Sequence, residues 1–485
     1  MADHMQLLAA GETPTSGSTA DARGAQGDEP GATGEMRAGT AKVPITPEAH
    51  YNLAGYTRGE GVISALLRHR RATGVHDDIY ARCLALSDGS TTLALVALDL
   101  IGFFHEDVLA VRQQVEDLTG RRDVLVMVAS THTHSAPDTY GIYGGVPQAY
   151  RRLVHRRAAE AVAQALQALA PARLSALETR VEGLVANLRH PERGATDSVV
   201  SALLVDRAGP ATPTTAPGSA APTTVPGPAI PAPAVRPVAT AAVPGPAATG
   251  ALSTAAPAIC TLVNFACHPN ILGITNTLIS ADFPGYLCRH LEEGRGGMGL
   301  FFNGAVGDIH PALAVFAPGG KPDIPDERGL RTFDTAREVG ETLGRAVLTA
   351  RPEPLTAGRN ASLTVTRREI YLPADNRLLK LLRYLGVIRR RLYRGLVKTE
   401  SWRIDLGPAQ ILTIPGQLMC RQGMALRERM TGRFRFLIGL ANDEIAYVIP
   451  PEEFGHGGEE VVSLGPRVWP SLRQQLPLEG EPARG

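Results

Sequence analysis

The sequence predicts an α/β fold: a layered domain with a mixed β-sheet flanked by helices. Apolar strand-like runs alternate with amphipathic helical segments from Ala41 onward, and a tight turn joins two of the runs. The chain has 485 residues, of which 44% are hydrophobic. A chain of this size and composition can bury one large core.

The elements follow one another in chain order. "RCLALSDGSTTLALVALDL" predicts two strands joined by a turn at Asp88-Gly89. "HEDVLAVRQQVEDLTG" has helical spacing that stops at Gly120, and "DVLVMVAS" predicts the next strand. A long amphipathic helix is predicted from Gln148 to Leu169.

Three segments depart from this pattern. Residues 1–40 are poor in large apolar side chains and predict a disordered tail, because burial cannot offset the entropy of ordering them. Residues 208–258 are a Pro/Ala/Thr-rich, low-complexity insertion, and residues 471–485 are expected to be a flexible C-terminus. Strand-like runs on both sides favour an insertion in a hairpin loop of one domain, spanning 41–470, over a linker between two domains.

Charge and cysteine content exclude some functions. Lys and Arg total 49 against 48 Asp and Glu, a net charge of +1, so we expect no nucleic-acid partner. The five cysteines are widely spaced without a Cys-x-x-Cys pair, which is typical of reduced thiols in a cytoplasmic protein. We find no secretory signal pattern and no apolar run of about 18 residues, so neither secretion nor a transmembrane helix is expected.

Polar side chains directly follow several predicted strands. His132 and His134 follow "VMVAS", His268 follows "VNFAC", and Asp308 and His310 follow "GLFFNGAVG". Such strand exits meet at the rim of an α/β sheet, where sites are commonly built. The alternative is that these segments are three unrelated turns, but we favour the interpretation that they share one rim of the sheet. Asp99, near the end of "TLALVALDL", could orient a site histidine or cap a helix or turn, and the sequence favours neither role over the other.

A basic amphipathic segment spans 376–398. It mixes Leu, Ile and Tyr with eight Lys and Arg residues and is interrupted at Gly386. The interpretation we favour is an ordinary surface helix packed on the sheet; the alternative is peripheral contact with a membrane.

Several short motifs occur in one order along the chain. "NLAGY", "VHDDIYARCLAL", "STHTHSAPD", "NFACHPN", "SADFPGYLCRHLE", "NGAVGDIHP", "TIPGQL" and "LANDEIAYVIPPEEF" together resemble the N-terminal catalytic domain of the neutral/alkaline (non-lysosomal) ceramidases, over about 42–460 except the insertion. The resemblance implies a zinc (Zn²⁺) amidohydrolase of sphingolipid metabolism that cleaves the amide of an N-acyl sphingoid base.

The resemblance also assigns roles to individual residues. His132, His268 and Tyr447 would be zinc ligands, and His134 the acid/base group. Arg189 would face the polar head of the substrate, assisted by Asn187. Asp308, beside His310, is a further candidate for the substrate site.

The sequence departs from the family pattern at three positions. Gln417 stands where the family has a zinc-binding glutamate, His310 where it has a serine, and Glu459 where it has a tyrosine. A neutral amide is a weaker ligand than a carboxylate, so Gln417 or His310 would complete the metal site; alternatively, His310 could be a catalytic acid/base group.

We therefore predict a cytoplasmic, zinc-dependent amidohydrolase acting on a small-molecule or lipid amide, such as an N-acyl amine or a biosynthetic intermediate. The same groups could run the reaction as a condensation. Two alternatives remain open: a metal-free, non-catalytic ligand-binding relative, and an enzyme that hydrolyses esters or transfers acyl groups.

Overall fold

The computed structural model describes residues 34–56, 69–191, 194–208, 224–225, 256–312, 329–355, 362–455 and 458–478. Residues 1–33 of the predicted tail and most of the predicted insertion lie outside these ranges.

A large mixed sheet forms the centre of the fold. Its strands are hydrogen-bonded in the order β14-β12-β10-β8-β1-β5-β6-β7, and β11 and β16 also pair with β8. The pairs β6–β7 and β12–β14 are parallel, and the other neighbours along this order are antiparallel. The strands are β1 (Arg37–Pro44), β5 (Tyr80–Ser87), β6 (Thr92–Leu98), β7 (Val124–Ser130), β8 (Ala170–Val181), β10 (Val199–Arg207), β11 (Thr224–Val225), β12 (Ala258–Phe265), β14 (Met298–Asn303) and β16 (Glu353–Pro354).

A smaller sheet packs on one face of the large one. It has the order β17-β18-β19-β21, with β17 (Leu363–Pro373), β18 (Leu396–Leu406), β19 (Ala409–Thr413) and β21 (Phe434–Ile438). Short two-stranded pairings complete the strands: β2 (Asn52–Leu53) with β3 (Arg70–Arg71), β4 (Gly74–Val75) with β13 (Leu278–Ile279), β9 (Val185–Asn187) with β15 (Ile309–Pro311), and β20 (Gln417–Leu418) with β22 (Tyr447–Val448).

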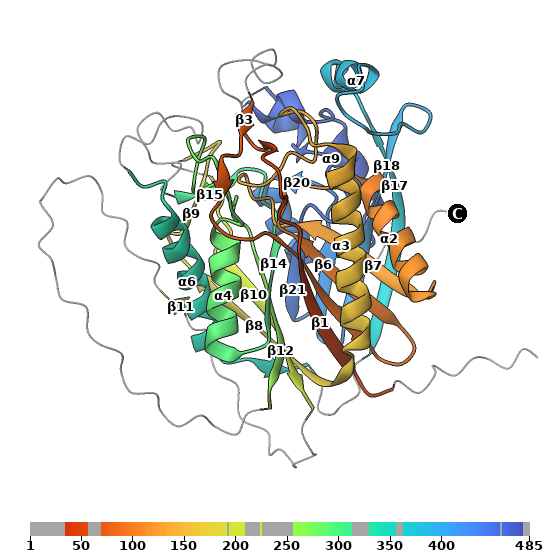
Figure 1. Cartoon of the computed structure of the whole chain (residues 1–485), viewed down its shortest axis with the longest axis vertical. Helices are drawn as coiled ribbons and strands as arrows, with labels where there is room; N and C mark the ends of the chain where they lie inside the picture. Colours follow the sequence, from red (N-terminus) through yellow and green to blue (C-terminus); the bar gives the residue numbers. More distant parts are fainter. Residues whose placement is uncertain are drawn as a thin grey trace, which may run out of the picture. The chain divides into compact units, whose positions relative to one another are not determined.

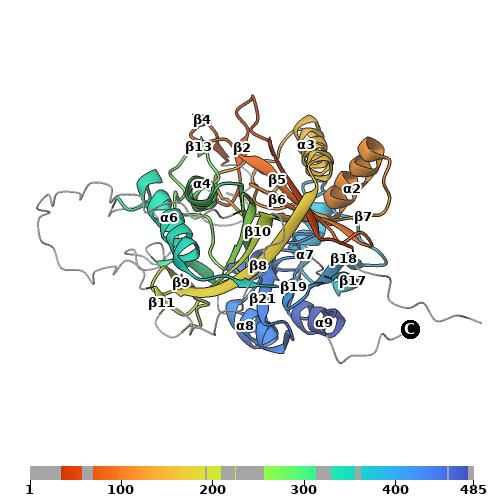
Figure 2. The same cartoon turned by 90° about the horizontal axis from the view of Figure 1, so that it is seen from below.

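Helices cover both outer faces of the two sheets. On the large sheet, α2 packs beside α3 and α4 beside α6, while α8 and α9 contact the small sheet (Figure 1). Figure 2 shows the resulting order of layers: helices, large sheet, small sheet, helices. The helices are α2 (His105–Thr119), α3 (Gln148–Gln167), α4 (Phe283–Arg295), α6 (Phe333–Thr349), α7 (Arg377–Tyr384), α8 (Cys420–Arg429) and α9 (Val468–Gln475), with short 3-10 turns at η1 (Pro451–Glu453) and η2 (Glu459–Val462).

Burial on both faces explains why the central strands are apolar throughout. In β5 and β6, Leu84 and Leu95 point into the core between the sheets, whereas Ala85 and Val96 join the core under α2 and α3. Alternate side chains of a strand point to opposite faces, so a sheet covered on both faces needs apolar residues at every position. The layered mixed-sheet α/β prediction is confirmed.

Several predicted elements are confirmed. β5 and β6 form the expected antiparallel hairpin, and α2 ends at Gly120 in a left-handed conformation. The strands that flank the insertion, β10 and β12, are antiparallel neighbours, as an insertion in a hairpin loop requires. Within the ranges described, no helix combines the length and the apolar character needed to span a bilayer.

The structure corrects three boundaries. The predicted tail is too long, because residues 37–40 belong to β1, where Gly39 lets the backbone of α3 approach closely. The predicted flexible C-terminus is too long as well, because residues 471–475 belong to α9, and Leu472 and Leu476 are buried. A helix over 376–398 is wrong: α7 ends at Tyr384, and Gly386 has a φ of 75°.

Candidate metal centre

Two strand exits are tied together at the site. The loop after β7 carries the His-Thr-His motif, and the loop after β12 carries His268. Asn303, the last residue of β14, donates from Nδ2 to the carbonyl oxygens of Thr131 at 3.1 Å and Cys267 at 3.0 Å. This one amide holds the two loops at a fixed spacing. Asn303 was missed as a candidate, although it is a polar residue at the end of an apolar strand.

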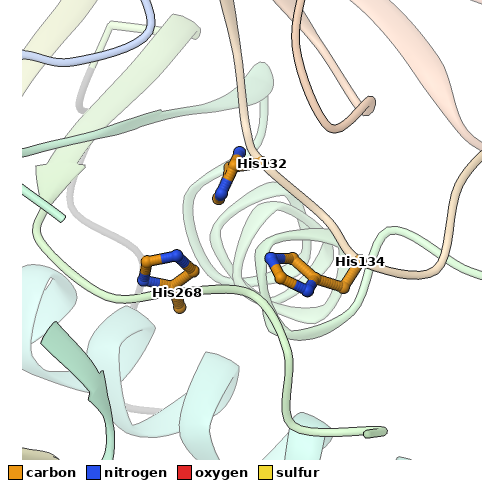
Figure 3. Close-up of side chains that lie close together, drawn as sticks. All are labelled: His132, His134 and His268. Atoms are coloured by element: carbon orange, nitrogen blue, oxygen red, sulfur yellow. The ribbon is translucent and has the colours of Figure 1, made fainter. Parts of the chain in front are cut away.

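Three buried histidines converge between these loops (Figure 3). One ligand nitrogen from each of His132, His134 and His268 lies within 4.8 Å of the others. Their ring centroids are 4.9 to 5.5 Å apart. This spacing suits three groups around one small cation, and the predicted meeting of two strand exits at one rim is what brings them together.

Backbone carbonyls fix the protonation of two of the rings. His132 Nδ1 lies 2.6 Å from the carbonyl oxygen of Ile101, and His268 Nδ1 lies 3.1 Å from that of Ile309. A carbonyl only accepts hydrogen bonds, so each Nδ1 carries the proton and each Nε2 keeps its lone pair, as in most metal-bound histidines. His268 Nε2 and both nitrogens of His134 are buried without a hydrogen-bond partner among the described residues.

Burial keeps the three imidazoles neutral. It lowers the pKa of His132 and His134 well below the usual value, and the neighbouring rings lower both further. The pKa of His268 falls to about 4 for the same main reason. Neutral imidazole is the form that binds metal, so the lone pairs are available at pH 7.

The position of His134 depends on Gly55. The φ of Gly55 is 92°, and a Cβ on it would lie 2.3 Å from His134 Nδ1. From the other side, the His134 backbone nitrogen donates to the carbonyl of Pro269 at 3.0 Å. His134 therefore lies close enough to His132 and His268 to share one cation with them, and its predicted acid/base role stays a prediction.

His310 takes a supporting place. Its ring stacks on His268 with centroids 4.0 Å apart and an interplanar angle of 5°, and its Nδ1 pairs with Asn270 Nδ2 at 2.9 Å. It is not one of the three converging histidines. The prediction that His310 completes the ligand set is therefore not supported by the geometry; its ring instead buttresses His268.

Gln417 and Tyr447 are brought together by strand pairing. They are partners in the parallel pair β20–β22, and both line the same cavity as His132 and His134. Gln417 contacts His132 and His268, and this contact raises the pKa of both rings, which partly offsets the effect of burial. Its buried Oε1 has no donor at hydrogen-bond distance among the described residues. Burial raises the pKa of Tyr447 well above its usual value, so its phenol stays protonated.

A carboxylate that was not predicted lies beside Gln417. Glu444 is 3% exposed, lines the same cavity, and accepts from Gln417 Nε2 at 3.2 Å and from the backbone nitrogen of Ala446 at 2.8 Å. Burial raises its pKa to about 8, and the charge of Asp443 adds to this, while the bond from Gln417 opposes it. The motif that contains it was recognised, but no spacing rule marked this residue within it.

The rest of the cavity is mainly apolar. It encloses about 110 Å³, and its apolar wall comprises Ile101, Phe104, Ile142, Leu379, Ile388, Leu392 and Leu464. Two exposed cations of α7, Lys380 and Arg383, also line it and mark its solvent end. His132 and His134 thus line one cavity that has an apolar wall and a basic rim.

Asn187 and Asp308 bind each other instead of a ligand. Asn187 Nδ2 donates to Asp308 Oδ2 at 2.6 Å, and the other carboxylate oxygen accepts from the backbone nitrogen of Cys420 at 2.7 Å. Neither is among the described residues that line the cavity. The two side chains join the end of β9 to the start of α8, and their predicted contact with substrate stays a prediction.

The side chain of Arg189 also binds other residues of the chain. Its side chain is 1% exposed and pairs with Glu459 at 2.7 Å and Glu460 at 2.8 Å, while Glu453 accepts from it through its backbone oxygen at 2.6 Å. It does not appear among the cavity-lining residues of the described chain. Arg189 thus clamps the η1–η2 segment, and its predicted contact with a substrate head group stays a prediction.

Asp99 has a structural partner too. Its Oδ2 accepts from Arg82 at 2.6 Å and from the backbone nitrogen of Tyr80 at 2.9 Å. Both bonds hold the ends of β5 and β6 together. These bonds favour the structural role of Asp99, and the alternative in which it orients a site histidine stays a prediction.

Solved structures of ceramidases are similar to this chain. The neutral ceramidase from Pseudomonas aeruginosa aligns with a TM-score of 0.64 and 17% identity, covering 92% of this chain and 76% of that one. A ceramidase complexed with C2 aligns with a TM-score of 0.63 and 17% identity, covering 92% and 77%. No protein-family model and no curated protein sequence matches the chain. The chain has a neutral ceramidase fold.

Proposed function

We propose that this protein is a zinc-dependent hydrolase of the amide bond of an N-acyl amine or ceramide-like lipid, and a divergent member of the neutral/alkaline ceramidase family. The observation that carries the proposal is the convergence of His132, His134 and His268, all buried and neutral, with His132 and His134 lining a cavity that has an apolar wall. The ceramidase fold supports it.

The unpartnered atoms fit a metal ion. His268 Nε2 and Gln417 Oε1 are buried acceptors without a donor among the described residues, and leaving such atoms unpaired costs free energy. Zinc favours imidazole nitrogen and tolerates oxygen ligands. When bound, it supplies a Lewis acid for the scissile carbonyl.

The rings divide into two kinds. His132 and His268 have fixed tautomers with Nε2 free, so we assign them as ligands, with Gln417 Oε1 and Tyr447 beside them. His134 has no partner on either nitrogen among the described residues, so it can release a proton from one nitrogen or take one up at the other. We assign it the transfer of a proton to the leaving amine. The apolar wall holds the acyl chain and limits water.

Metal content and amide hydrolysis test this proposal together. We expect about one zinc per chain in the wild type, and loss of the metal in His132→Ala and His268→Ala. The control is His155→Ala, which removes a buried histidine paired with Asp107. The loaded wild type should release fatty acid from an N-acyl amine or ceramide faster than from the matched ester.

No zinc in the wild type, even after incubation with the ion, would overturn the hydrolase mechanism and favour the ligand-binding alternative. Zinc with ester cleavage alone would favour the esterase alternative.

We also propose that α7 brings this cavity to an anionic lipid surface. One side of α7 contributes Leu379, Lys380 and Arg383 to the cavity lining, while Leu381 is 51% and Tyr384 84% exposed. Figure 1 shows α7 at the periphery, near β17 and β18. Exposed apolar and basic side chains on one short helix match the interface of an anionic bilayer.

Vesicle sedimentation tests this contact. We expect binding to vesicles of phosphatidylglycerol and phosphatidylcholine, weaker binding to phosphatidylcholine alone, and loss in Tyr384→Asp. Leu118→Asp is the matched control, because Leu118 is 53% exposed on α2. Equal binding of Tyr384→Asp and the wild type, or no binding by either, would refute the proposal.

A further inference from the structure

The oxygen ligand that Gln417 would offer the proposed metal centre is an amide carbonyl. Only Oε1 of this side chain can bind a cation, because Nε2 carries two hydrogens and donates. The orientation of the amide therefore decides whether Gln417 can be a ligand, and an inference about it rests on the proposed zinc-binding function.

One carboxyl group is placed to hold that amide. Among the described residues that line the cavity, Glu444 is the only acidic side chain. The adjacent Asp443 cannot take this role, because its carboxylate pairs with Arg390 and accepts from the backbone nitrogens of His105 and Glu444. Glu444 forms no ion pair within the described ranges, and its Oε2 has no hydrogen-bond partner there.

The contact between Glu444 and Gln417 fixes the amide. Only the nitrogen of a glutamine side chain can donate to a carboxylate, so Nε2 must point toward Glu444 Oε1, 3.2 Å away. The carbonyl oxygen Oε1 is then turned away from Glu444. Gln417 also touches His132 and His268, so its unpartnered Oε1 is available on the side of these rings.

The carboxylate is itself held in place. The backbone nitrogen of Ala446 donates to the same Oε1 at 2.8 Å, and Gln417 N in turn donates to the carbonyl of Ala446 at 3.0 Å. The two residues are therefore locked across the β20–β22 pairing. The donor and acceptor are preorganised without rearrangement of either loop.

We propose that Glu444 positions Gln417 as the oxygen ligand of the metal centre: it accepts from Nε2 and leaves Oε1 free on the side of His132 and His268. Glu444 is thus a positioning residue, and its effect reaches the ion through the amide.

An exchange of the two side chains tests the idea. Glu444→Gln replaces the accepting carboxyl group by an amide at nearly constant volume, and we expect a 10- to 100-fold loss of zinc affinity, the range typical of residues that support metal ligands. The double variant Gln417→Glu with Glu444→Gln returns a carboxylate to the pair and should recover most of that affinity. Affinity is measured by competition with a chelating dye, with no need for turnover.

The controls separate the possible failures. Glu400→Gln removes another buried carboxylate, 4% exposed and paired with Arg112, and should leave zinc affinity unchanged. Wild-type affinity in Glu444→Gln would overturn this inference while leaving the zinc centre intact, and absence of zinc in the wild type would overturn the proposed function itself. If Glu444→Gln does not fold, the double variant provides the test. A folded double variant that binds no zinc would refute the role of Glu444.

Discussion

The substitution Gly55→Ala should displace His134. The backbone at Gly55 has a φ of 92°, and its missing Cβ would lie 2.3 Å from His134 Nδ1, 2.4 Å from Cγ and 2.8 Å from Cβ. Ordinary contacts between such atoms lie at about 3.5 Å, so the ring must retreat by about 1.2 Å, the difference between 3.5 and 2.3 Å. His134 is 7% exposed and has little free space to move into.

The cost has two parts. An L-residue in the left-handed region costs about 1–2 kcal/mol, and forcing extra volume into a packed interior costs about 1–3 kcal/mol more. Gly55→Ala should therefore lower the free energy of unfolding by about 2–5 kcal/mol. A displacement of about 1 Å in a group that transfers a proton can also slow amide hydrolysis by about 100-fold.

Gly120→Ala is the matched control. Gly120 ends α2 with a φ of 67°, and a Cβ there would meet nothing within 4 Å, so this variant carries only the backbone strain. Urea unfolding of both variants separates the two parts, and hydrolysis is measured on the same preparations. Equal destabilisation by the two substitutions, with equal hydrolysis, would refute the packing of Gly55 against His134.

Three further predictions test the fold and the site. Trp402 is fully buried, with the guanidinium groups of Arg112 and Arg367 at 5.1 and 4.9 Å from its ring centroid, so Trp402→Ala should lower the free energy of unfolding in urea by about 3–5 kcal/mol. The pKa of His268 is lowered to about 4 by burial, so the unfolded chain binds the proton first. The free energy of unfolding of the metal-free protein should therefore decrease as the pH falls from about 6.5 toward 4. At pH 4.5, this decrease should be smaller by about 2–3 kcal/mol in His268→Asn than in the wild type. Arg189→Ala should speed proteolysis in the segment that Arg189 clamps and leave zinc affinity unchanged, whereas a large change in affinity would contradict a purely structural role.

The sequence was informative wherever a short-range pattern determines structure. Alternation and turn residues identified β5, β6 and β7, and polar residues at strand ends identified His132, His134 and His268 as neighbours. Both signals are local: a buried strand must be apolar, and the residues directly after it lie at a sheet edge. The hairpin assignment of β10 and β12 succeeded because a loop of any composition can join antiparallel neighbours.

Side-chain partners were harder to predict because they depend on long-range packing. Arg189 looked like a substrate contact until the fold placed it against Glu459 and Glu460, some 270 residues away. Asp99 looked like a support for a histidine, but Arg82 on the next strand reaches it first. No periodicity encodes which acid meets which base, so motif positions alone could not distinguish a ligand contact from an internal clamp.

The same limit explains the two residues that were missed. Asn303 matters because its amide spans the ends of β7 and β12, and Glu444 matters because the parallel pairing of β20 with β22 places it beside Gln417. In both cases, a sequence position considered without its neighbours in the fold is misleading. A glutamine in place of a charged ligand suggests a lost metal site, yet its meaning changes once a buried carboxylate holds its nitrogen and frees its oxygen. Whether a site can still bind a metal is therefore decided by the side chains around the altered position.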